Sequence, residues 1–189
     1  MTSDPDSPPP APTTRPRLLV VCGLPGVGKT SVAAALASRT GAAHLSIDVI
    51  EDAILGSGLP PSWQVGVAAY EVARASAELA LAGGLDVVVD AVNDSEEARA
   101  TWHRAALAAG AELQVVHLVV SDQAEHERRL SGRDRGFHHV LEPSWRDVLA
   151  RRDAYAPWDE EPARIDTAGR DLDDVLETLI AVTARPETT

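Results

Sequence analysis

The chain lacks several features that would assign it to common classes of protein. It has a single cysteine among 189 residues, so a disulfide framework is excluded and a thiolate would have no partner. Aromatic residues make up only 4% of the chain, and no apolar run approaches the length that crosses a membrane. The one cysteine, Cys22, lies in a short apolar run, and we expect it to be a small residue of the core.

Positive charge is also scarce. The formal net charge is −12, from 17 lysines and arginines against 29 aspartates and glutamates. Nucleic-acid-binding proteins usually carry a basic face, so this balance argues against a broad phosphate-binding surface and against a nucleic-acid partner. It leaves room for a local basic pocket.

The two ends of the chain differ in composition from the rest. Residues 1–16 are rich in proline, serine, threonine and aspartate, and they lack both the basic start and the apolar stretch of a signal peptide. We predict a disordered leader over 1–16, one domain over 17–184 and a frayed tail over 185–189. A cytoplasmic protein with no membrane partner is expected.

One glycine-rich segment points to a definite chemistry. It matches the pattern G-x-x-x-x-G-K-[ST] at every required position: Gly23, Leu24, Pro25, Gly26, Val27, Gly28, Lys29 and Thr30. A strand is expected before it and a helix after it, the setting in which backbone N–H groups wrap a phosphate chain. In such a loop Lys29 reaches the β- and γ-phosphates and Thr30 ligates Mg²⁺. The segment therefore predicts binding of ATP with Mg²⁺.

Apolar runs and helical patterns alternate along the whole domain. Strands are expected at 17–22, 43–47, 85–89, 113–120 and 163–167, with helices at 31–37, 49–55, 63–81, 94–109, from 122, at 144–155 and at 171–183. Asp94 and Glu97 look like the cap of the helix over 94–109. The alternation predicts an α/β fold, a three-layer sandwich of the P-loop NTPase type with a five-stranded parallel sheet.

Polar residues follow two of the predicted strands. In an open parallel sheet, ligands bind beyond the carboxyl ends of the strands. Asp48 and Asp90, with Asn93, stand at such ends, so the two carboxylates should converge near the γ-phosphate. We assign Asp48 as the base that takes a proton from an attacking hydroxyl, and Asp90 to the substrate or to Mg²⁺-bound water, with Asn93 also at the acceptor. Helix capping is the alternative role for each aspartate.

An arginine-rich segment over 127–136 follows the fourth strand. Arg129 and Arg133 are four residues apart and would share a helical face. We interpret the segment as a lid that closes over the triphosphate, with Arg133 catalytic and Arg129 and Arg135 contacting the nucleotide. The alternative is a solvated charged face. Trp63 could equally line the acceptor pocket or pack against the start of its own helix.

These motifs, in this order, resemble the small P-loop kinases often labelled AAA-family ATPases. The resemblance rests on 23–30, 46–48, 88–93 and the arginine-rich lid, and it covers about 17–183. The set is also similar to the kinase domain of bacteriophage polynucleotide kinase, to chloramphenicol phosphotransferase and, more distantly, to gluconate and shikimate kinases. It implies that Asp48 is the catalytic aspartate, that Asp90 is the acidic residue after the third strand, and that Arg133 or Arg135 is the lid arginine.

One position departs from the polynucleotide kinase pattern. There, an arginine three residues after the catalytic aspartate holds the acceptor phosphate, whereas this chain has Glu51. Glu51 instead suits a cationic or hydroxyl-rich acceptor. The leading hypothesis is transfer of the γ-phosphoryl group of ATP to a hydroxyl of a small molecule, such as an antibiotic, nucleoside or sugar-like compound. The alternatives are a 5′-hydroxyl polynucleotide kinase and a nucleotide-dependent switch or binding module.

Overall fold

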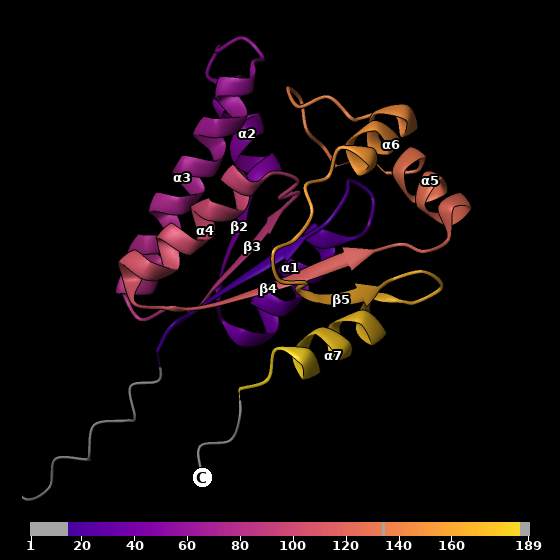
Figure 1. Cartoon of the computed structure of the whole chain (residues 1–189). Coiled ribbons are helices and arrows are strands. Elements are labelled where there is room, and N and C mark those ends of the chain that lie inside the picture. Colours follow the sequence, from indigo (N-terminus) through magenta and orange to yellow (C-terminus); the bar gives the residue numbers. More distant parts are fainter. Residues whose placement is uncertain (1–14, 134, 186–189) are drawn as a thin grey trace, which may run out of the picture.

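The computed structural model describes residues 15–133 and 135–185 (Figure 1). The leader predicted over 1–16 and the tail predicted over 185–189 lie almost entirely outside these ranges. Within the described ranges, no helix is both long enough and apolar enough to cross a bilayer.

The strands form one parallel sheet, as predicted. They are β1 (Arg17–Cys22), β2 (Ala43–Ser46), β3 (Val87–Ala91), β4 (Glu112–Val119) and β5 (Ala163–Asp166), in the order β2-β3-β1-β4-β5. The helices are α1 (Lys29–Thr40), α2 (Ile47–Gly56), α3 (Trp63–Ala82), α4 (Glu96–Ala109), α5 (Gln123–Ser131), α6 (Trp145–Asp153) and α7 (Leu172–Val182). The five-stranded sheet of the prediction is confirmed.

Helices cover both faces of the sheet and make the expected three layers (Figure 1). On one face α1 and α7 pack Leu36 and Leu176 against inward-facing residues such as Val21. On the other face α3 and α4 pack against Val20 of β1. Trp102 of α4 is buried in the same cluster. The central strand β1 is buried on both sides, which explains its unbroken apolar run.

The abundance of alanine has a packing role in α3. Ala69, Ala73 and Ala77 recur every four residues and are fully buried, with Leu81 continuing the stripe. Residues at this spacing lie on one face of a helix. Their small side chains let the helix backbone approach the sheet closely, so a core with few aromatic rings still closes.

Three of the predicted boundaries are wrong. Asp90 lies inside β3 and pairs with Ser46, so it does not follow the strand. The N-cap of α4 is Ser95, whose side chain accepts from the Ala98 N–H. Asp94 is engaged elsewhere, because its carboxylate pairs with Arg151 at 3.2 Å.

The third correction concerns the arginine-rich segment. Helix α5 ends at Ser131, and Gly132 follows as its C-cap. Arg133 therefore lies beyond the helix and shares no helical face with Arg129. The next helix, α6, begins with a reciprocal capping box of Ser144 and Asp147.

Candidate active site

The phosphate-binding motif forms a tight loop between β1 and α1. Gly23, Gly26 and Gly28 have φ angles of 137°, 92° and 97°, which L-residues with side chains rarely adopt. A Cβ at Gly23 would lie 2.3 Å from the carbonyl oxygen of Leu118 on β4. The loop is thus pressed against the neighbouring strand, and glycine is required there by space as well as by conformation.

Lys29, the only lysine of the chain, is buried at the start of α1 with 7% of its surface exposed. Its ammonium donates to the Leu24 carbonyl oxygen at 3.0 Å. Burial lowers the pKa of Lys29, and Arg133 adds to the lowering, while Asp48 and Asp90 oppose it. A buried cation held by one backbone carbonyl is suited to an incoming anion, and this fits a phosphate chain.

Asp90 is 2% exposed and collects three hydrogen bonds. Its Oδ1 accepts from Thr30 Oγ1 at 2.8 Å and from Ser46 Oγ at 3.3 Å, and its Oδ2 lies 2.8 Å from His44 Nε2. Ser46 pairs with Asp90 in the sheet. His44 comes two residues before Ser46, so both side chains lie on the same face of β2 and both can reach Asp90. A carboxylate and a hydroxyl oxygen side by side suit Mg²⁺.

Asp48 stands in the first turn of α2 and meets the lid. Its carboxylate forms an ion pair with Arg135, a residue 87 positions later. Arg135 also pairs with Glu142 at 2.5 Å, and Glu142 pairs with Arg133 at 2.7 Å. The predicted base and the two predicted lid arginines are therefore one connected group of side chains.

Sequence reasoning missed the residue that fastens the lid. A single oxygen of Asp52, Oδ1, accepts the backbone N–H groups of His138, His139 and Val140 at 3.1, 2.8 and 2.9 Å. These bonds lower the pKa of Asp52. The available signal was its spacing, since Asp52 lies one turn after Asp48 and on the same face of α2.

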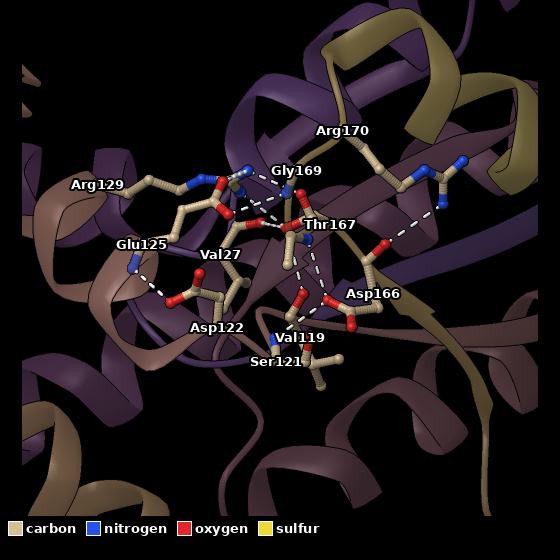
Figure 2. A network of polar contacts seen from close by, with 11 residues as sticks. Val27, Val119, Ser121, Asp122, Glu125, Arg129, Asp166, Thr167, Gly169 and Arg170 are labelled. Carbon is tan, nitrogen blue, oxygen red and sulfur yellow. Dashed lines mark hydrogen bonds and ion pairs between the residues drawn. The ribbon is translucent and has the colours of Figure 1, made fainter.

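Arg129 occupies a different place from the other lid arginines. Figure 2 shows it reaching from α5 to Thr167, where it donates to Oγ1 at 2.8 Å and to the carbonyl oxygen at 2.7 Å. It also pairs with Glu125, whose second oxygen accepts the Gly169 N–H. Thr167 Oγ1 in turn donates to the Val27 carbonyl at 3.3 Å. Arg129 thus ties α5 to the turn beside the phosphate loop, and its contact with a nucleotide stays a prediction.

Three of the residues predicted to contact the acceptor differ in burial and in their contacts. Glu51 is half-buried on α2, where burial and the nearby Asp48 raise its pKa. Asn93 is 1% exposed, and its Oδ1 accepts from Trp102 Nε1 at 2.8 Å, a structural role. Trp63 is 73% exposed at the start of α3, so it is not packed against its helix. Only Glu51 lies beside the predicted base, and acceptor contacts of all three stay predictions.

Fold and site together define a P-loop nucleotide-binding protein, and the comparisons agree. Residues 18–155 match the family model described as an AAA domain, and the chain belongs to this family. No protein of curated function matches the sequence.

Several solved structures share the fold. One is an APS kinase from Mycobacterium tuberculosis in complex with AMPPNP and APS, with a TM-score of 0.67 and 20% identity, covering 90% of this chain and 99% of that chain. Another is the tunicamycin resistance protein of Deinococcus radiodurans, with a TM-score of 0.65 and 19% identity, covering 91% and 98%. A gluconokinase from Sinorhizobium meliloti 1021 has a TM-score of 0.60 and 20% identity, covering 88% and 91%. The fold is that of the P-loop kinases, as the motifs predicted, and family and fold together support a phosphotransferase.

Proposed function

We propose that the protein transfers the γ-phosphoryl group of ATP to a hydroxyl of a small molecule, with Asp48 as the general base. The observation that carries the proposal is that two carboxylates and one guanidinium surround the Lys29 ammonium at one end of the sheet. Lys29 lies within the electrostatic reach of Asp48, Asp90 and Arg133. A binding module would need the cation, but it would not need a carboxylate beside it to receive a proton.

The residues divide the work as follows. The loop of residues 23–30 would hold the phosphate chain through its backbone N–H groups, and Lys29 would neutralise the β- and γ-phosphates. Thr30 and Asp90 would hold Mg²⁺, which supplies charge neutralisation at the phosphates when bound. Asp48 would take the proton of the acceptor hydroxyl. The acceptor oxygen bonds to the γ-phosphorus as the bond between that phosphorus and the bridging oxygen breaks, and this oxygen leaves with ADP.

The lid arginines suit the developing charge. Arg133 is partly buried, and its Nε has no hydrogen-bond partner among the described residues. Asp48 must release Arg135 before it can meet an acceptor, so acceptor binding and lid rearrangement are coupled in this proposal. On α2, Glu51 favours an acceptor that carries hydroxyl or amino groups rather than a phosphate.

The test is a transfer assay with Mg²⁺-ATP and a panel of nucleosides, sugars, antibiotics and oligonucleotides. ADP release is followed together with a mass gain of one phosphoryl group on the acceptor. A mass gain confined to 5′-hydroxyl oligonucleotides, with strong salt dependence, would support the polynucleotide kinase. Tight ATP binding without transfer to any compound would support the switch.

The Asp48→Asn variant tests the assignment of the base. We expect transfer to fall by at least about a hundredfold, because general-base catalysis contributes that much, while ATP affinity is kept. The matched control is Asp159→Asn, an exposed aspartate that belongs to neither the loop over 23–30 nor the segment over 127–136, which should transfer normally. Full activity of Asp48→Asn would remove the assignment while leaving the kinase proposal standing.

A further inference from the structure

A cavity of about 580 Å³ lies beside the carboxyl end of β4, between the phosphate loop and residues of α5 and α6. Leu24 and Val27 of the loop form one wall, and Trp145 and Leu149 of α6 form another. Lys29, Asp48 and Asp90 are not among its lining residues. Its volume is that of a site for a small organic molecule.

One wall is a stack of flat rings. The His117 ring on β4 stacks on Tyr155, with centroids 5.4 Å apart and planes 17° apart, and Trp158 lies 5.8 Å from His117. The stack is held rigidly, because the Tyr155 hydroxyl donates to the Val92 carbonyl at 2.7 Å and the Arg99 guanidinium lies 3.7 Å over the Trp158 ring. A preformed aromatic wall of this kind favours a planar partner.

Two donors at this wall lack partners. Trp158 Nε1 is buried and has no hydrogen-bond partner in the described part of the chain. Arg164 lies on β5 opposite His117 and lines the cavity, and within residues 15–133 and 135–185 its side chain forms no hydrogen bond or ion pair. Because the Arg164 side chain is exposed and lines the cavity, a ligand carboxylate can reach its guanidinium, whereas the buried Trp158 Nε1 offers a ligand no accessible atom. Glu161 lines the same cavity and partly offsets the positive charge of Arg164.

We propose that this cavity binds a planar aromatic carboxylate. The ring lies against His117 and Trp158, and the carboxylate accepts from the Arg164 guanidinium. Because Leu24 and Val27 form part of the wall, the occupant contacts the phosphate loop from outside the nucleotide site. It binds together with a nucleotide and does not replace it. This site goes beyond the proposed kinase function and does not depend on it.

The probe is 1-naphthoate, titrated calorimetrically into the whole protein with and without saturating Mg²⁺-ADP. We expect saturable 1:1 binding that survives the nucleotide, and binding of 1-naphthamide that is weaker. Arg164→Gln should weaken naphthoate binding about tenfold, since a hydrogen bond to a charged group is lost. Arg128→Gln is the matched control, because Arg128 is an exposed arginine of α5 outside the cavity, and it should bind like the wild type.

A second variant acts through volume instead of charge. Leu149→Trp should fill the cavity and remove naphthoate binding, and its circular dichroism and melting temperature show whether it folds. No binding at millimolar naphthoate, displacement by Mg²⁺-ADP, or equal affinity of Arg164→Gln and the wild type would each overturn the proposal. The Arg164→Gln result stands alone if Leu149→Trp does not fold, because Arg164 is exposed and substitution there disturbs no packing.

Discussion

At the scale of single residues, the site depends on a cation placed where water cannot solvate it. Lys29 is buried, and the charges around it are mixed: two carboxylates favour its charged form, while Arg133 disfavours it. The balance leaves its pKa below the ordinary lysine value. Such an ammonium gains more from an incoming phosphate than a solvated one would, because its own desolvation has already occurred.

The pKa of Lys29 can be measured without interference, because no other lysine is present. Reductive ¹³C-methylation gives one ε-dimethyl NMR signal besides that of the N-terminus. We expect this signal to titrate at lower pH in the folded protein than in the same methylated protein in urea, because burial disfavours the charged amine. Asp90→Asn should lower the folded value further. Equal values in the folded and unfolded protein would contradict the burial of the ammonium.

Gly23 allows a second test at residue scale. Gly23→Ala places a Cβ 2.3 Å from the Leu118 carbonyl oxygen, so the loop or β4 must shift. We expect a loss of about 3 kcal/mol in the free energy of unfolding, and weaker ATP binding. Gly84→Ala is the matched control: its φ is also positive, at 83°, but a Cβ there meets nothing within 4 Å. It should lose only about 1 kcal/mol. Urea unfolding compares the two, and equal losses would contradict the steric argument.

At the scale of elements, helix α2 carries three acidic side chains with different contacts within about two turns. Glu51 and Asp52 follow Asp48 by three and four residues, so both lie on the side of α2 that carries Asp48. Asp48 holds Arg135, and Asp52 holds the backbone of the segment that follows it. One helix therefore carries the proposed base, a residue predicted for the acceptor and the anchor of the segment predicted as a lid.

This arrangement predicts how the lid responds to a change in α2. Asp52→Ala removes the acceptor of three N–H groups, so the segment over 135–140 should open more often and trypsin should cleave after Arg135 several-fold faster. Asp52→Asn keeps one oxygen in place, and all three donors use a single oxygen, so it should restore most of the protection. Timed digestion with mass spectrometry reads the sites. Identical cleavage rates in Asp52→Ala and the wild type would show that the anchor is unimportant.

At the scale of the whole molecule, the strand order brings the site together. Because β1 and β3 are adjacent at the centre, the phosphate loop after β1 meets Asp90 on β3. Because β2 is next to β3, His44 and Ser46 reach the same carboxylate, and α2 begins beside it. On the other side of β1, β4 supplies the strand against which Gly23 packs.

The buried core also makes a prediction about alkaline stability. Burial raises the pKa of Cys22 to about 12 and raises the pKa values of Tyr70 and Tyr155. The unfolded chain releases these protons near pH 9 to 10, whereas the folded chain holds them, so rising pH favours the unfolded state. Each such group should remove about 1.4 kcal/mol per pH unit above its unfolded-state pKa, while Lys29, whose pKa is lowered, should offset one of them up to about pH 10.4.

Urea unfolding between pH 8 and pH 11 checks this dependence. Cys22→Ala lacks the thiol and should show a smaller loss between pH 9 and pH 10, where the cysteine of the unfolded chain ionises first. A wild-type protein whose unfolding free energy stays level to pH 11 would contradict the burial of all three groups.

The sequence by itself determined the parallel α/β sheet, the phosphate-binding loop and the resemblance to P-loop kinases. These are local properties: apolar runs, capping residues and a glycine motif act over a few neighbours in the chain. The boundary errors at Asp90 and Ser95 arose where contacts with distant residues decide between two local options.

Only the tertiary structure decided which side chains meet. Arg129 and Arg133 stand four residues apart, yet one ties α5 to Thr167 and the other joins Glu142, because α5 ends between them. The pairing of Asp48 with Arg135 joins residues 87 positions apart. No local pattern encodes such contacts, since they depend on where strand order and helix packing place each side chain in space.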